Sequence, residues 1–142
     1  MTQDQIPNET DKAYAAGLLD ADGSICLVDC KSYVQVNVYI ASQDLDLIRW
    51  LVETFGGRHQ VMGRVHAWWP PAPSHEWLRL VRPYLHTKKS QADLVFEYKA
   101  ATYKGISSEW GQRSKELNGR LPRLHPKKEG VQAEEDPRGN TT

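Results

Sequence analysis

The stretch AAGLLDADGSI, from Ala15 to Ile25, joins a helix-like run of small and apolar residues to two closely spaced acids and a glycine. Asp20 and Asp22 stand at the end of this run, directly before Gly23. The C-terminus of a helix carries partial negative charge, so an exposed acid there costs about 0.3–1 kcal/mol. We therefore expect another group to offset this unfavourable placement.

The residues that precede this stretch predict a helix. Thr10 or Asp11 can cap a helix that begins near Lys12 and runs to about Asp20. Gly23 then provides a flexible C-cap.

A β-hairpin is expected next, because two strand-like runs, SICLVD and YVQVNVYIAS, flank a turn at residues 30–32. Apolar and polar residues alternate in the second run, which is typical of a strand with one buried face. The residues on the face expected in the core are Val34, Val36, Val38 and Ile40, and those on the other face are Gln35, Asn37 and Tyr39.

The following residues predict an amphipathic helix and a second hairpin. The helix, SQDLDLIRWLVETFGG, has Ser42 or Asp44 near its start and Gly56 or Gly57 at its end. The hairpin pairs RHQVM with VHAWW through a turn at residues 63–64, and prolines end its second strand. Trp68 and Trp69 are consecutive in that strand, so one of them must face away from the core.

Two further helices complete the expected order, and a third helix follows them. HEWLRLVRPYL is capped by Ser74 and limited by Pro83. SQADLVFEYKAATYKG is capped by Ser90 or Thr87 and closed by Gly105. The third is SSEWGQRSKEL.

The order α-β-β-α-β-β-α-α predicts an α+β fold. If the two hairpins join into one antiparallel four-stranded sheet with helices on one face, the other face stays open and polar. Long polar side chains on such a sheet can enter a DNA major groove and read base edges. The residues expected on this face are Gln35, Asn37, Tyr39, Arg58 or His59, Gln60, Arg64 and His66.

Composition limits the alternatives. The 142 residues suffice for one domain, which we assign to residues 10–118 after a lead-in over residues 1–9. Residues 119–142 form a basic and then acidic tail that we expect to be disordered. There is no apolar run long enough to cross a membrane and no signal-peptide pattern, so we expect an intracellular protein without a membrane partner.

The cysteines and the charges are the remaining compositional evidence. Cys26 and Cys30 lack a second pair at zinc spacing, which favours free thiols over a metal cluster. The 18 basic residues balance the 18 acidic ones, so net charge gives no indication of a nucleic-acid partner. The basic residues between Arg113 and Lys128 are either a solvated tail or an arm that contacts phosphates.

The string AAGLLDADG, residues 15–23, resembles the LAGLIDADG motif of homing endonucleases, with Ala15 and Leu19 as its departures from that motif. The α-β-β-α-β-β-α order is also that family's fold, and the resemblance covers residues 8–105. It implies a saddle-shaped sheet and a Mg²⁺-dependent, site-specific DNA endonuclease that leaves 3′ overhangs. No small-molecule substrate is implied.

The resemblance also implies roles for individual residues. Asp22 would be the direct metal ligand with the backbone carbonyl of Ala21 beside the metal, whereas Asp20 would be structural. KKSQADLV resembles the region that holds the family's basic active-site residue, which makes Lys88 the candidate and Lys89 its alternative. A polar residue at the entrance to the second helix would be Gln43, which matches by type, or Ser42, which strand alternation favours.

A dimer follows from the same helix. Ala13, Ala16 and Gly17 leave one helix stripe almost bare of side chains, so a second copy of the helix can approach closely. Packing about a twofold axis would bring Asp22 of each copy together, with Asp20 at the same interface, and a cation such as Mg²⁺ would relieve the repulsion.

Family members with one motif act as homodimers on near-palindromic DNA, and the chain has a single copy of the motif. We therefore expect a homodimer on double-stranded DNA. The alternatives are a non-cleaving relative, such as an intron maturase or a transcription regulator, and a protein-interaction dimer.

Overall fold

The structure, a computed structural model, describes residues 6–30, 32–101 and 109–119. Its helices are α1 (Glu9–Asp22), α2 (Leu45–Phe55), α3 (Ser74–Val81), α4 (Lys89–Ala100) and α5 (Trp110–Gly119), with a 3₁₀ turn, η2 (Arg82–Tyr84), after α3. Its strands are β1 (Gly23–Asp29), β2 (Val34–Ser42), β3 (Arg58–Met62) and β4 (Val65–Trp69). Within the described ranges, no helix is long and apolar enough to cross a membrane.

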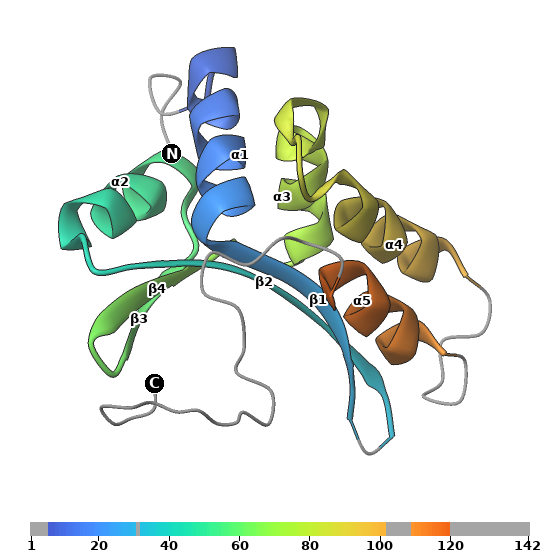
Figure 1. Ribbon diagram of the computed structural model, residues 1–142. Coiled ribbons are helices and arrows are strands. Elements are labelled where there is room, and N and C mark those ends of the chain that lie inside the picture. Colours follow the sequence, from blue (N-terminus) through green and yellow to red (C-terminus); the bar gives the residue numbers. More distant parts are fainter. Residues whose placement is uncertain (1–5, 31, 102–108, 120–142) are drawn as a thin grey trace, which may run out of the picture.

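The four strands form one antiparallel sheet in the order β1-β2-β4-β3. The helices lie on one side of this sheet, and both hairpins bend away from them, so the opposite face is concave and carries none of the described helices (Figure 1). The predicted α+β class and element order are confirmed. The predicted tail from residue 120 onward and the predicted helix end at Gly105 lie outside the described residues.

Strand register determines which side chains face the helices. Ile25 pairs with Val38, and Ile40 pairs with Trp68, and all four side chains are buried in the core. Trp68 donates its indole N–H to the carbonyl of Gly56 over 2.8 Å. Its neighbour in β4 must therefore project from the open face, as the two consecutive tryptophans predicted.

The same register corrects one predicted residue of the open face. His66 lies two residues before buried Trp68 and so shares its helix-side face. Its Nδ1 lies 2.8 Å from Nε2 of His59, which has the same strand parity. Of the two alternatives at the start of β3, Arg58 therefore faces the open side and His59 does not. The polar side chain of His66 suggested that it lies on the open face. The burial of Trp68 instead determines which residues of β4 face the helices, and His66 is one of them.

Helix starts differ from expectation where the capping group is not the nearest polar residue. α1 begins three residues earlier than predicted, because Asn8 and Asp11 form a reciprocal capping box. Asp44 caps α2 as expected. Ser74 is the first residue of α3 rather than its cap, and no side chain caps that helix.

Gly23 lies at the junction of α1 and β1, where lack of space, and not conformational freedom, explains the glycine. It is the C-cap residue of α1, as expected, but its backbone is extended, with φ −103° and ψ 178°, which does not require the flexibility of glycine. A Cβ added at this position would lie 2.4 Å from Cδ1 and 2.8 Å from the carbonyl oxygen of Leu19. The glycine is required because the chain folds back closely on the last turn of α1.

Helix α5 covers the outer edge of β1, which the sequence did not predict. The backbone N–H of Leu27 donates to Oγ of Ser114 over 2.9 Å, and the amide of Asn118 donates to the carbonyl of Ile25 over 3.2 Å. α5 is held to α4 by an ion pair of Arg113 with Glu97 at 3.0 Å. These contacts satisfy part of an exposed strand edge, and they engage Arg113 within the chain instead of leaving it for phosphate.

Gly23→Ala is expected to lower the free energy of unfolding by about 1–3 kcal/mol, because the new methyl group collides with Leu19. Chemical denaturation measures this loss. Gly119→Ala is the matched control, since a Cβ there meets nothing within 4 Å. Equal stability of the two variants would contradict the close approach.

Candidate active site and nucleic-acid face

Asp20, the first acid of the motif, is held by the turn that leads into α4. Its carboxylate accepts hydrogen bonds from the backbone N–H groups of His86 at 2.8 Å, Thr87 at 3.2 Å and Lys88 at 3.1 Å. The hydroxyl of Thr87 also donates to it, over 3.1 Å. Asp20 therefore binds a neighbouring element of its own chain.

This contact also explains why the predicted local caps of α4 are wrong. Neither Thr87 nor Ser90 caps the helix, and Lys88 is its N-cap residue without a side-chain capping bond. The backbone donors before the helix find their acceptor on α1 instead. These donors belong to residues that precede the helix, so Asp20 holds the turn before α4, and the first turn of α4 has no side-chain cap among the described residues.

Lys88 is the buried one of the two candidate lysines. Its side chain donates to the carbonyl oxygen of Asp20 over 2.7 Å, and the residue is 7% exposed. Burial lowers the pKa of the Lys88 amine, while the negative charges of Asp20 and Asp22 act in the opposite direction. Lys89, by contrast, is exposed on the first turn of α4. Of the two, Lys88 is the lysine at the C-terminal end of α1.

Asp22 is the last residue of α1 and is exposed, as is Ala21 beside it. The chain enters β1 directly after Asp22, so this acid lies where the central helix meets the sheet (Figure 1). Its charge acts on Lys88. The structure thus brings a carboxylate and a buried ammonium group to one end of α1.

The two polar candidates after β2 are placed differently. Oγ of Ser42 accepts the backbone N–H of Asp44 over 3.0 Å, so this hydroxyl takes part in the turn into α2. Gln43 is exposed in the bend between β2 and α2. Because Gly23 pairs with Ile40, this bend lies at the same end of the strands as Asp22.

Asp22 and Ala21 supply oxygen donors of the kind that Mg²⁺ prefers, a carboxylate and a backbone carbonyl. Within the described ranges, no three or more His, Cys, Asp or Glu side chains are grouped to hold a metal ion. One chain therefore offers part of a donor set. The residues fit a site that a second copy, or phosphate oxygens, would complete.

The small residues of α1 divide between the core and the surface. Ala16 is fully buried, so its expected place in a dimer interface is wrong: it packs within its own chain. Ala13, Gly17 and Ala21 are exposed and follow one another at intervals of four residues. A Cβ added to Gly17 meets nothing within 4 Å. We call these three residues the α1 stripe. The dimer contacts proposed for Ala13, Gly17 and Asp20 stay predictions.

The open face carries the polar side chains that strand alternation predicted. Those exposed to solvent are Gln35, Arg58, Gln60 and Arg64, and those partly buried are Asn37 and Tyr39. They extend over both hairpins of the sheet. Their contact with nucleic acid stays a prediction.

Trp69 is the residue of this face that the sequence did not single out. Its indole Nε1 donates to Oε1 of Gln60 over 2.9 Å. The guanidinium of Arg58 lies 5.1 Å from its ring centroid, and the ring of Tyr39 lies 4.8 Å away. The adjacent tryptophans were the available signal, because only one of them could be buried.

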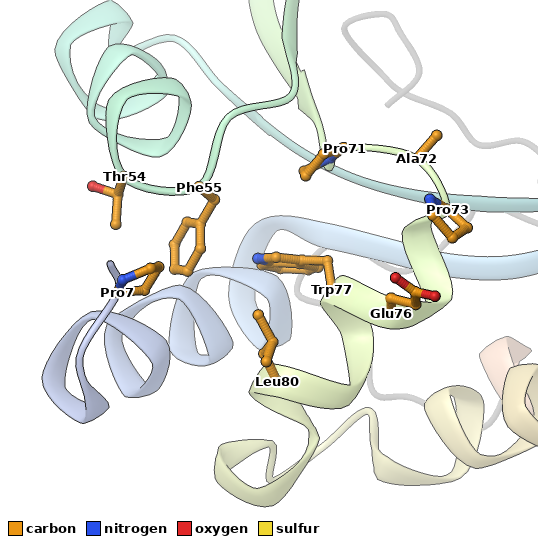
Figure 2. Close-up of a pocket in the computed structure, with 9 residues that line it drawn as sticks. All are labelled: Pro7, Thr54, Phe55, Pro71, Ala72, Pro73, Glu76, Trp77 and Leu80. Atoms are coloured by element: carbon orange, nitrogen blue, oxygen red, sulfur yellow. The ribbon is translucent and has the colours of Figure 1, made fainter. Parts of the chain in front are cut away.

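A largely apolar pocket of about 360 Å³ lies on the helix side, apart from the motif acids (Figure 2). Trp77 and Leu80 of α3 face Phe55 at the end of α2 across it. Trp77 packs against the ring of Phe55 with centroids 5.7 Å apart. Glu76 is the one titratable residue among those that line the pocket, so the pocket does not bring several acidic or basic side chains together.

The fold, a four-stranded antiparallel sheet with helices on one side, is that of solved homing endonucleases. I-CvuI in complex with the I-CreI target, with Mg and uncleaved DNA, matches with a TM-score of 0.62 and 19% identity over 82% of this chain and 87% of that one. I-CvuI with its own target and Ca gives a TM-score of 0.52 and 21% identity, over 77% and 73% of the two chains.

An archaeal intron-encoded enzyme, I-Vdi141I complexed with DNA, gives a TM-score of 0.56 and 13% identity over 83% of this chain and 90% of that one. At these identities the likeness shows the fold. No protein-family model and no curated protein matches the chain.

Asp20→Asn is expected to lower the free energy of unfolding by about 2 kcal/mol, because an amide replaces a charged acceptor of several hydrogen bonds. Asp93→Asn, which breaks the surface ion pair with Arg82, is the control and should cost below about 1 kcal/mol. Denaturation curves that rank the two variants in the reverse order would contradict the role given to Asp20.

Proposed function

We propose that this protein is a site-specific DNA endonuclease that acts as a homodimer and hydrolyses one phosphodiester bond in each strand of a near-palindromic target with Mg²⁺. The observation that carries the proposal is that Asp22, the last residue of α1, and Lys88, whose ammonium group contacts the carbonyl of Asp20, lie at the same end of α1, where the helix meets the sheet. The fold shared with DNA-bound homing endonucleases supports it.

DNA would bind to the concave face of the sheet. Side chains such as Gln35 and Asn37 project from the β1–β2 hairpin, and Arg58 and Arg64 from the β3–β4 hairpin. Arginine and amide side chains form specific hydrogen bonds with base edges in the major groove. The neutral net charge of the chain is compatible with this binding, because basic side chains are needed only on the face that contacts DNA.

Asp22 and the carbonyl of Ala21 would hold Mg²⁺ together with the second copy and the DNA. A bound Mg²⁺ lowers the pKa of a water molecule and stabilises negative charge on phosphate oxygens. Lys88, held at 2.7 Å by the carbonyl of Asp20, would place its ammonium group against the charge that develops on the scissile phosphate. Gln43 would orient a water molecule by hydrogen bonding.

Two copies would meet through the α1 stripe. Ala13, Gly17 and Ala21 present no side chain larger than a methyl group, so two helices can pack with their backbones close together. A twofold axis at this contact would bring both Asp22 carboxylates to one place and one sheet to each half of the DNA target. One set of chemical groups would then act on each strand.

Asp22→Asn is expected to abolish cleavage, at least about 10³-fold, and to leave DNA affinity within a few fold, because the charged metal ligand is lost while the sheet is unchanged. A randomised duplex library, incubated with Mg²⁺ and sequenced at the cut ends, measures the activity. Asp46→Asn, on the exposed surface of α2, is the control.

Cuts by wild type and by Asp46→Asn at one near-palindromic site would support the proposal, as would their absence with Asp22→Asn. Cleavage by Asp22→Asn at the wild-type rate would contradict the metal ligand. Enrichment of bound sequences without cuts would make the protein a DNA-binding relative that does not cleave.

Gly17→Leu is expected to convert the dimer to a monomer, because an isobutyl group on the α1 stripe keeps the two helices apart. Sedimentation velocity measures the change in mass. Ala100→Leu, at the exposed end of α4, is the control and should remain dimeric. If Gly17→Leu sediments as a dimer, the α1 stripe is not the interface.

A further inference from the structure

We infer that Trp69 is a positioning residue for base readout: it orients Gln60 and Arg58 so that both present hydrogen-bond donors, and this end of the open face selects guanine. The inference rests on the proposed function, because it assigns the specificity of the same DNA-binding face. It starts from the four side chains of Trp69, Gln60, Arg58 and Tyr39, which we call the Trp69 cluster.

The chemistry of tryptophan fixes which end of the Gln60 amide faces it. An indole N–H donates and never accepts, so the atom of Gln60 that lies 2.9 Å from Nε1 must be the carbonyl oxygen. The amide NH₂ group consequently points away from Trp69. Gln60 is exposed, so this NH₂ group is available on the open face.

The indole ring is itself held in place by two packing contacts besides its hydrogen bond to Gln60. Tyr39 packs against it at 4.8 Å with the ring planes inclined by 35°, and Arg58 lies above it at 5.1 Å. Arg58 is the cross-strand partner of Trp69, and Gln60 pairs with Ala67, two residues before Trp69 on the same face. The register of β3 and β4 therefore maintains the cluster without bound DNA.

Arg58 and the amide of Gln60 present donors toward the groove, because the acceptor of Gln60 is turned toward Trp69. Arg58 has five N–H donors and no acceptor, and the oxygen of Gln60 is already engaged by Trp69. Guanine offers two acceptors, N7 and O6, at its major-groove edge. Adenine needs an acceptor opposite its N6 amino group for the usual paired contact with glutamine, and Gln60 does not offer one while Trp69 holds it.

Selection of bound duplexes from a random library tests this inference. Loss of preference in Gln60→Ala identifies the base pair that Gln60 contacts, and wild type should select guanine there. Trp69→Phe keeps a ring beside Arg58 and Tyr39 but removes the N–H, so the amide can turn over. Adenine should then rise at least about fivefold relative to guanine at that base pair, with total affinity within about threefold.

Gln60→Glu gives a second readout if Trp69→Phe disturbs the fold. Glutamate keeps an acceptor for the indole N–H and directs its other oxygen to the groove, so the preference should change from guanine to cytosine or adenine, which carry amino donors. Trp77→Phe is the matched control, because its indole N–H is buried on the helix side and has no hydrogen-bond partner among the described residues. It should leave every base preference unchanged.

Adenine as the wild-type choice at the Gln60 base pair would overturn the inference, as would an unchanged preference in both Trp69→Phe and Gln60→Glu. In either case the DNA-binding function would stand, because wild type still selects sequences. A wild-type protein that enriches no sequence would overturn the proposed function and this inference together.

Discussion

The hydrogen bonds between Asp20 and the turn before α4 are the contact on which the candidate site depends. They join the C-terminal end of α1 to the segment that carries Lys88, two elements far apart in sequence. The C-terminal end of α1 carries partial negative charge, which disfavours an acid there. Backbone N–H groups of residues 86–88 stabilise the Asp20 carboxylate, and the ammonium group of buried Lys88 contacts the backbone carbonyl of the same residue. The first of the two acids at the end of α1 is thus explained within a single chain.

Asp22 lacks such a compensating arrangement among the hydrogen bonds of the described residues, and it is exposed where α1 meets the sheet. In the proposed complex with DNA, a bound cation would stabilise the Asp22 carboxylate, as backbone N–H groups of the same chain stabilise that of Asp20. In the proposed function the two acids of the motif have different roles: Asp20 holds the segment that carries Lys88, and Asp22 would bind the metal ion. The exposed small residues of α1 would let a second copy approach this end of the helix in the proposed dimer.

The sequence predicted the α+β fold and the order of the elements well, because alternation in β2 and the apolar pattern of α2 are strong local signals. It failed where a partner is distant in the chain. The backbone N–H groups before α4 donate to Asp20 of α1, and the face of His66 follows from the burial of Trp68. Ala16 and Gly17 are both small, yet only packing against the sheet decides which of them is buried. The Trp69 cluster depends on strand register, which composition does not reveal.

The most direct measurement of the central claim is the position of a divalent ion in a crystal of the protein with its selected duplex. Manganese in place of magnesium would identify the ion by its anomalous scattering. The account predicts an anomalous peak bound by Asp22 from each of two copies and by phosphate oxygens, with the DNA on the concave face of the sheet. A metal peak away from Asp22, or DNA bound on the helix side, would contradict it.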